Sequence, residues 1–387
     1  MIELPKNRKG EFMKKILILY AAYGGGHYSA AKSIKNYLDK NYNVETSIVD
    51  CIEYVNKILN RVTTGAYKEM ARKAPNLWGK VYSNSQKGIL GHLSSRSNKM
   101  MAIKLKHLVQ DEKPDLVIST HPFSSQMISY LKRKGKINCK LVTVLTDFAP
   151  HEQWLIGFEQ TDAFFVSNDN MYKYLCDYGV PKEKVFVTGI PLSEKFFEEF
   201  DKNSIFEEFN LDKNKPLILF FGGGEFWLGK DRTVQILDAL IHNLTTCQII
   251  AISGRNKKMN ESFNELVQKN NVQERVKVLE YTNKVPELMS ISTLVVTKPG
   301  GLTTSESLAS ELPILVINPI PGQEEENAEF LEAHNVAVWL KKSDDPNKVI
   351  QDLFSNPAKL AEMKNNAKIL AKRNSTKDIC ETIIKLL

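Results

Sequence analysis

The sequence lacks the marks of several large protein classes. Its 387 residues contain no apolar run of the roughly 18–20 residues that a membrane-spanning helix needs. No apolar core of the signal-peptide kind lies near the N-terminus, which argues against secretion. The five cysteines form no CxxC pair and no zinc-ligand spacing, so we expect reduced thiols in a cytosolic protein; they are Cys51, Cys139, Cys176, Cys247 and Cys380.

Low-complexity tracts and short repeats are also absent. The chain is 42% hydrophobic and 25% charged, an ordinary globular composition that excludes the disordered and collagen-like classes. At about 150 residues per domain, the length predicts two domains. A chain of this length can bury ample core without disulfides.

Acidic residues are almost missing from one stretch. Between Lys57 and Lys106 there are eleven Lys and Arg residues and a single acid, Glu69. This stretch carries a charge of +10, whereas the whole chain carries +7. Aromatic residues are interleaved with its basic ones, which include Lys68, Arg72, Lys73 and Lys80 around Trp78. The charge predicts an anionic partner. An anionic membrane, a solvated basic face and a nucleic-acid surface all fit it, although no nucleic-acid-binding motif is present.

Short apolar segments alternate with helical segments along the chain. They are continuous runs, as in parallel strands that are covered on both faces. The first series is 16–20, 44–49, 116–119, 141–145, 163–166 and 185–188, and the second is 217–221, 248–252, 276–279, 294–297, 314–317 and 336–340. Two such series predict an α/β protein with two Rossmann-like, doubly wound domains and an interdomain cleft. We place the domains at residues 13–200 and 201–387, and we expect 357–387 to form an amphipathic helix that can pack back on either one.

The loop after the first expected strand is rich in glycine and leads into a helix. It reads Tyr23-Gly24-Gly25-Gly26-His27. Glycines let the backbone approach a ligand, and the helix N-terminus offers free N–H groups to an anion. A plain strand–helix turn fits too, as does a dinucleotide site with Asp50 at the ribose, although Ser29 replaces the third glycine of that motif. The helix dipole disfavours a charged His27 ring, which keeps it available as a general base.

A second glycine-rich loop follows the expected strand 217–221. It runs from Gly222 and Gly223 to Lys230 and Asp231. The spacing from Gly224 to Lys230 matches a P-loop, but Asp231 stands where a Ser or Thr would hold magnesium. We therefore expect this loop to face a diphosphate, as a glycine-rich loop of a different kind.

Two further loops carry polar groups just after strands. Residues 297–306 read TKPGGLTTSE, so a helix N-terminus can hold a phosphate while Glu306 accepts hydrogen bonds from ribose hydroxyls. Residues 319–327 read PIPGQEEEN, a cluster of acids and amides that suits a polyol. The plain alternatives are a capped helix with a first-turn glutamate and a solvated acidic helix start.

Four motifs together resemble one enzyme family. They are GGGHxSAA at 24–31, TDF at 146–148, TKPGGxTxxE at 297–306 and PGQExxN at 321–327. The chain carries these motifs in the order in which the family 28 glycosyltransferases carry them. It is similar in particular to bacterial processive diacylglycerol glucosyltransferases and plant monogalactosyldiacylglycerol synthases. The resemblance covers about residues 14–375. It implies a GT-B fold, with the acceptor on the N-terminal domain and a UDP-sugar mostly on the C-terminal domain.

The resemblance also implies roles for the residues at matching positions. His27 falls on the candidate base, and Asp147 is the reserve base or the group that orients the acceptor. His151 and Trp154 fall in the stretch that the plant enzymes use near the acceptor and an anionic lipid. The donor-binding positions are Gly25, Gly26, Gly223, Arg255, Gly300, Gly301, Thr303, Glu306, Gln323, Glu324 and Asn327. The bulky Glu225-Phe226-Trp227 departs from the smaller loop of the family, which leaves the approach of the diphosphate there open.

The implied activity is an inverting transfer of a hexose, either glucose or galactose, from a UDP-hexose to diacylglycerol. The implied place is the cytoplasmic face of the cell membrane, with anionic lipids as partners and no nucleic acid. Because the chain has no Asp-x-Asp motif, we expect no metal and no other cofactor. The alternatives are a lipid II-type N-acetylglucosaminyltransferase, a UDP-sugar 2-epimerase, a nicotinamide-dependent oxidoreductase and a membrane-binding module without catalysis. The sequence predicts neither the number of sugars added nor the oligomeric state.

Overall fold

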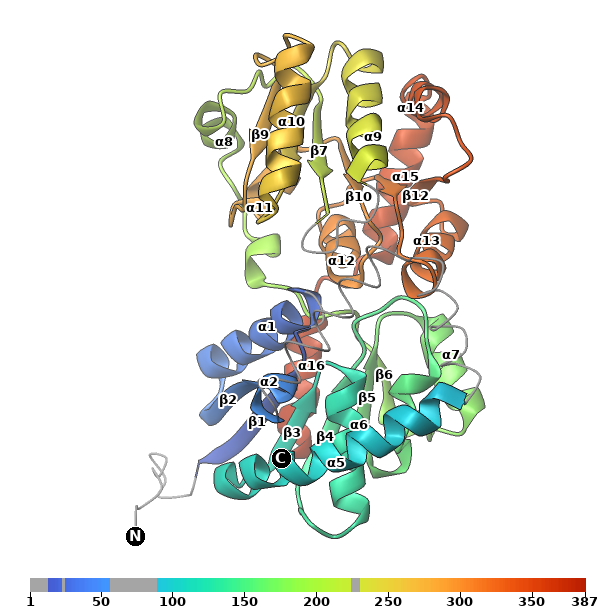
Figure 1. The fold of residues 1–387 in the computed structure, drawn as a ribbon. Helices are drawn as coiled ribbons and strands as arrows, with labels where there is room; N and C mark the ends of the chain where they lie inside the picture. The colour runs from blue at the N-terminus through green and yellow to red at the C-terminus, as the bar shows by residue number, and fades with distance from the viewer. Residues whose placement is uncertain (1–12, 23–24, 56–88, 224–229) are drawn as a thin grey trace. The chain divides into compact units, whose positions relative to one another are not determined.

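The structure is a computed structural model of the chain (Figure 1). It describes residues 13–22, 25–55, 89–223 and 230–387, with the backbone alone for 89–100. These residues form two compact units. Unit 1 comprises the described residues up to Ser193 together with Lys372–Leu387, and unit 2 comprises the described residues of Glu194–Ala371. We expected the boundary between the two domains after residue 200. In the structure it lies after Ser193.

Strands and helices alternate through unit 1. In chain order its elements are β1 (Lys14–Tyr20), α1 (Gly25–Asn41), β2 (Val44–Asp50), α2 (Cys51–Val55), α5 (Ile89–Glu112), β3 (Leu116–Ser119), α6 (Pro122–Arg133), β4 (Lys140–Val144), the short 3-10 helices η1 (Glu152–Trp154) and η2 (Phe158–Gln160), β5 (Ala163–Val166), α7 (Asp169–Tyr178), η3 (Lys182–Lys184), β6 (Val185–Val187) and α16 (Ser375–Leu386).

The described part of unit 1 contains a six-stranded sheet in the order β2-β1-β3-β4-β5-β6, and each neighbouring pair is parallel. Side chains alternate between its two faces along β1. Ile16 and Ile18 pack with α1 and α16, whereas Leu17 and Leu19 pack with α2, α5 and α6. Helices thus cover both faces (Figure 1), which explains why the strands are continuous apolar runs.

Unit 2 repeats the same alternation. In chain order its elements are η4 (Glu194–Phe197), α8 (Lys202–Glu208), β7 (Leu217–Phe221), α9 (Lys230–Asn243), β8 (Gln248–Ile252), α10 (Lys257–Lys269), β9 (Val276–Leu279), α11 (Val285–Ile291), β10 (Leu294–Thr297), α12 (Gly301–Ala309), β11 (Ile314–Ile317), α13 (Gln323–Ala333), β12 (Ala337–Leu340), α14 (Pro346–Phe354) and α15 (Pro357–Leu370).

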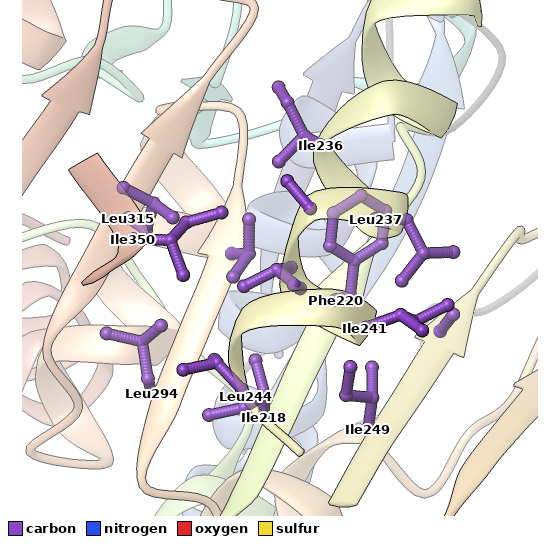
Figure 2. Close-up of a cluster of buried hydrophobic side chains, with 14 of the residues drawn as sticks. Ile218, Phe220, Ile236, Leu237, Ile241, Leu244, Ile249, Leu294, Leu315 and Ile350 are labelled. Carbon is purple, nitrogen blue, oxygen red and sulfur yellow. The ribbon is translucent and has the colours of Figure 1, made fainter. Parts of the chain in front are cut away.

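Among the described residues of unit 2, six parallel strands form a sheet in the order β12-β11-β10-β7-β8-β9. Its core lies between the sheet and the helices that cover it. Figure 2 shows α9 placing Ile236, Leu237 and Ile241 against Ile218 and Phe220 of β7. All five of these side chains are 2% exposed or less, so this face of the sheet is closed to water.

Side-chain caps set several of the helix starts, and with them the ends of the loops. His121 precedes α6 and accepts a hydrogen bond from the N–H of Phe123. Asn168 and Asn256 cap α7 and α10 in the same way. Such caps satisfy N–H groups that have no partner inside the helix. They therefore define where the loops after β3, β5 and β8 end.

The C-terminal segment differs from the single helix that we expected over 357–387. It forms two helices, α15 in unit 2 and α16 in unit 1. The helix breaks because Ala371 adopts an extended conformation. The hydroxyl of Thr376 then both donates to the carbonyl oxygen of Leu192 at 2.7 Å and accepts from its N–H at 3.0 Å. These bonds tie the start of α16 to unit 1.

The two-sheet α/β architecture predicted from the sequence is confirmed. Seven of the expected strands have the observed bounds, and the other five differ by one or two residues at an end. Within the part of the chain that the structure describes, no helix is both long and apolar enough to cross a bilayer.

Candidate active site

His27 lies at the carboxyl ends of three neighbouring strands of unit 1. It belongs to the first turn of α1, which follows β1. Thr120 and His121 follow β3, and Thr146 and Asp147 follow β4. Since β1, β3 and β4 are adjacent and parallel, their carboxyl ends share one edge of the sheet. Ligands of open parallel sheets bind at this edge.

Hydrogen bonds define which nitrogen of the His27 ring carries the proton. Nδ1 lies 2.7 Å from the carbonyl oxygen of Thr120 and 3.0 Å from the hydroxyl oxygen of Thr146. Because a carbonyl oxygen only accepts, we infer that Nδ1 is protonated and that Nε2 holds the lone pair of the neutral ring. The Thr120 hydroxyl donates in return to the carbonyl oxygen of His27 at 3.0 Å. The ring is thus oriented through Nδ1, which leaves Nε2 as its basic atom.

Burial favours the neutral form of this ring. It lowers the pKa of His27 from its ordinary value of 6.5, and the charge of Asp147 opposes the shift without cancelling it. The His121 ring meets His27 edge-on, with centroids 4.5 Å apart. Burial, followed by the nearby His27, lowers the pKa of His121 well below 6.5. A neutral His27 was expected from the helix dipole, whereas burial is the main cause in the structure.

Asp147 is buried and is held by aromatic neighbours. Its Oδ2 accepts a hydrogen bond from the indole N–H of Trp154 at 3.1 Å and lies 3.7 Å from Nε2 of His151. The Trp154 side chain is 1% exposed and belongs to a hydrophobic cluster of unit 1. We expected Trp154 near the acceptor and an anionic lipid. In the structure the indole is buried and supports the Asp147 carboxylate, and the place of the acceptor stays a prediction.

The glycine loop of unit 1 leaves room at the start of α1. Gly25 opens the helix, and a Cβ added there would meet nothing within 4 Å. Gly26 follows in the same turn.

The Asp50 carboxylate binds the backbone that follows it. Its Oδ1 accepts from the N–H groups of Ile52 at 3.0 Å and Glu53 at 3.1 Å. It caps α2, so the carboxylate needed by a dinucleotide site is already engaged.

In unit 2, the loop after β10 leads into α12 without a side-chain cap. Gly300 precedes the helix and supplies no side-chain cap to the N–H groups of its first turn, which contains Gly301 and Thr303. Glu306 lies on the next turn and is partly buried. Burial raises its pKa from 4.5 to about 8. Within the described residues the carboxyl group has no hydrogen-bond partner, so a ligand can supply one.

The three residues expected to hold a hexose lie at the start of α13, but two of them already bind the protein. Glu324 pairs with Lys298 at 3.1 Å and accepts from the N–H of Ile320 at 2.7 Å. The Asn327 amide donates to the carbonyl oxygen of Pro299 at 2.9 Å. Gln323 is partly buried, and its amide has no partner in the part of the chain described. The start of α13 is thus fastened to the loop after β10.

Two more loops of unit 2 end at the same edge of the sheet. Gly223 follows β7 with φ +81°, a left-handed conformation that favours glycine. Gly254 follows β8 with φ +62°. Beside it the guanidinium of Arg255 lies 4.9 Å from the centroid of the Tyr281 ring, which is 64% exposed. This exposed pair offers a flat cationic and aromatic surface to a planar ligand.

Two family models match the chain, one in each half. The model described as monogalactosyldiacylglycerol (MGDG) synthase matches residues 27–192, and the model described as glycosyl transferases group 1 matches residues 201–370. A processive diacylglycerol beta-glucosyltransferase of Bacillus cereus (strain ATCC 10987 / NRS 248) is 29% identical over 370 residues, which is 96% of this chain and 93% of that protein. In both halves the chain is therefore similar to family 28-like glycosyltransferases. A protein of the same name from Bacillus thuringiensis (strain Al Hakam) is 28% identical over 371 residues, with the same coverage of both chains.

Solved structures share the fold of this chain. The Staphylococcus aureus MnaA–UDP co-structure has a TM-score of 0.65 at 15% identity, and covers 96% of each chain. The crystal structure of Acinetobacter baumannii MurG has a TM-score of 0.61 at 15% identity, and covers 96% of this chain and 99% of that one. The expected GT-B fold is therefore confirmed.

Sequence reasoning did not single out four residues of this glycosyltransferase that the structure brings to its sites. They are Thr120, His121, Lys298 and Tyr281. Each follows a strand, so the rule that ligands bind at carboxyl ends could have found them. The predicted lipid-binding residues Lys68, Arg72, Lys73, Trp78 and Lys80 lie outside the described residues. Within the described ranges, no three or more His, Cys, Asp or Glu residues are grouped so that they could hold a metal ion.

Proposed function

We propose that this glycosyltransferase moves a hexose from a UDP-hexose to the free hydroxyl of diacylglycerol, with inversion at the anomeric carbon. The names of its relatives support the acceptor and favour glucose as the hexose. The observation that carries the chemistry is the orientation of His27, whose Nδ1 is used by Thr120 while Nε2 remains basic. A general base with this protonation is what an inverting transfer to an alcohol requires.

In the proposed reaction, Nε2 of His27 takes the proton of the diacylglycerol hydroxyl. The oxygen of that hydroxyl forms a bond to the anomeric carbon from the face opposite UDP. The bond between that carbon and the diphosphate oxygen breaks, and UDP leaves with the electron pair. An α-linked donor therefore gives a β-glycoside. The lowered pKa of His27 keeps the ring neutral before the reaction, so that it is ready to accept the proton.

On unit 2, the uncapped N-terminus of α12 is the proposed site of the donor diphosphate. Its N–H groups and the helix dipole would stabilise the charge that develops on UDP as it leaves. We assign Glu306 to the ribose, because its carboxyl group has no other partner in the described chain. Gln323 would contact the hexose, and the Arg255–Tyr281 surface would meet the uracil. Since the chain has no Asp-x-Asp motif, we propose that the transfer needs no metal ion.

We propose that the protein acts at the cytoplasmic face of the cell membrane as a peripheral protein. The basic stretch 57–106, with its charge of +10, supports attraction to anionic lipids. Each surface Lys or Arg contributes about 1 kcal/mol to such binding, and aromatic side chains anchor at the level of the headgroups.

A single panel of assays tests the proposal. UDP-glucose, UDP-galactose and UDP-N-acetylglucosamine are each incubated with the full chain and diacylglycerol in anionic vesicles, with and without EDTA. We expect β-hexosyl-diacylglycerol, identified by chromatography and mass spectrometry, with equal yield when EDTA is present. Release of N-acetylmannosamine products without acceptor would instead indicate an epimerase. A loss of activity in EDTA that magnesium restores would contradict the metal-free mechanism.

A further inference from the structure

We propose that Lys298 is a positioning residue of the donor site, which aims the Glu324 carboxylate at the hexose. This inference rests on the proposed function, because it takes unit 2 as the UDP-hexose site. In the sequence this lysine stands in the motif TKPGGxTxxE, but no role of its own was assigned to it.

The ion pair between Lys298 and Glu324 is well protected from water. Nζ lies 3.1 Å from Oε1 and 3.4 Å from Oε2, and the side chains are 17% and 16% exposed. Exposed lysine–carboxylate pairs contribute little, because water screens them and both side chains lose rotamer entropy. A pair at this exposure is screened less. Lys298 also comes directly after β10, which holds its backbone in place.

The pair fixes where the carboxylate lies. Oε2 of Glu324 accepts from the N–H of Ile320 at 2.7 Å. The carboxylate is therefore held both by the Lys298 ammonium and by a backbone N–H. Oε1 would lie 3.8 Å from a Cβ added at Gly300. Gly300 precedes α12, so one edge of the carboxylate lies beside the proposed diphosphate site. A carboxylate has about four lone-pair positions, and the Lys298 and Ile320 bonds leave acceptor capacity for a sugar hydroxyl.

The charge of Lys298 also removes an electrostatic conflict. A diphosphate at the start of α12 would lie close to the negative Glu324, and like charges in a partly buried place repel. The Lys298 ammonium neutralises Glu324 at this point. Asn327, on the next turn of α13, donates to the carbonyl oxygen of Pro299 at 2.9 Å. This neutral bond holds α13 to the loop when the ion pair is removed, so loss of Lys298 changes aim and charge more than fold.

The inference predicts a larger effect on the binding of UDP-glucose than on the binding of UDP. In Lys298→Met, titration calorimetry without acceptor should show about tenfold weaker binding of UDP-glucose, the size expected for one charge-assisted contact. Binding of UDP alone should weaken less than binding of UDP-glucose, because UDP carries no hexose hydroxyl for Glu324 to accept from and loses only the charge compensation by Lys298. Lys298→Arg should restore most of the lost affinity for UDP-glucose. Lys368→Met is the matched control, because Lys368 pairs with Glu311 in the same unit but lies on α15.

A double-mutant cycle shows whether Lys298 acts through Glu324. If it does, Lys298→Met combined with Glu324→Gln should bind UDP-glucose no more weakly than Glu324→Gln alone, because coupled residues are not additive. Equal loss of UDP and UDP-glucose in Lys298→Met, or additive losses in the double variant, would overturn the inference. A parent protein that binds neither ligand would count against the proposed function itself.

Discussion

The carboxylate of Asp147 accepts the indole N–H of Trp154 at 3.1 Å, and both residues are buried. This bond joins a polar group at the carboxyl edge of the unit 1 sheet to the hydrophobic core beside it. It gives Asp147 one fixed orientation close to His151, at 3.7 Å. The consequence can be measured with a substitution that keeps an aromatic ring and removes the indole N–H donor.

Trp154→Phe should lower the thermal midpoint of the protein by about 4 °C or more, since it leaves a buried carboxylate without its donor and opens space in the core. Differential scanning calorimetry measures this shift. Trp339→Phe is the control, because Trp339 is only partly buried, in unit 2. A Trp154→Phe protein as stable as the parent would mean that this bond does not support Asp147.

Substitution of His27 tests the proposed base directly. His27→Ala should reduce turnover by about 10²–10⁴-fold, the usual contribution of a general base. Because burial lowers the pKa of His27 below 6.5, the parent should keep its activity as the pH falls to about 6.5. Initial rates between pH 5 and 8 check both points. Undiminished turnover in His27→Ala would remove this residue from the mechanism.

Glu306 should make UDP binding release a proton. Its pKa of about 8 means that the free protein holds this carboxyl protonated at pH 7, whereas ribose hydroxyls donate to the ionised form. Calorimetric titrations of UDP in buffers of different ionisation enthalpy measure the released proton. The parent should release up to about one proton more than Glu306→Gln, because only the parent has a carboxyl group there. Equal release by both proteins would contradict the assignment.

The same raised pKa has a consequence for stability, with a defined sign. The folded protein binds this proton more tightly than the unfolded chain, whose value is the ordinary 4.5. The stabilising contribution is therefore complete below about pH 4.5 and is lost as the pH rises through about 8. Thermal midpoints of Glu306→Gln and the parent, measured over this pH range, isolate the contribution of this proton to stability. The midpoint of Glu306→Gln should rise relative to that of the parent between these pH values.

Gly222 is required by the core of unit 2. A Cβ at this position would lie 2.7 Å from the Phe263 ring, and Phe263 is fully buried. Gly222→Ala should lower the thermal midpoint by about 5 °C, because the ring cannot move without disturbing the core. Gly25→Ala is the matched control, with nothing within 4 Å of the added Cβ. A midpoint unchanged by Gly222→Ala would show that Phe263 has room to shift.

Replacement of Lys68, Arg72, Lys73 and Lys80 by glutamine should weaken binding to anionic liposomes at least about tenfold, since each contributes electrostatic attraction. Raised salt should weaken the parent in the same way. Sedimentation with liposomes measures both effects. Replacement of the exposed lysines Lys257, Lys258, Lys364 and Lys368 removes the same charge from unit 2 as a control. Equal sedimentation of the first variant and the parent would exclude this patch as the anchor.

The sequence predicted the fold far better than the details of the site. Buried parallel strands such as 163–166 are continuous apolar runs, so their position can be found from local composition. The roles of Glu324 and Trp154 depend on how the chain packs around them. Glu324 forms an ion pair with Lys298, and Trp154 is enclosed by the core of unit 1. The residues next to Glu324 or Trp154 in the sequence do not indicate either contact. Likewise the attachment of α16 to unit 1 involves Thr376 binding Leu192, a contact between residues far apart in the sequence.

The placement of α16 in unit 1 has a consequence for the order in which the chain folds as it leaves the ribosome. Ile379, Cys380 and Ile383 are fully buried against α1 and the unit 1 sheet. Unit 1 therefore has an open apolar face until α16, residues 375–386, has been synthesised, although all six strands of its sheet are synthesised before. Unit 2 draws on a later and nearly continuous stretch, 194–371, so it can close earlier. Unit 1, most of which is translated first, is therefore the last of the two units to complete its hydrophobic core.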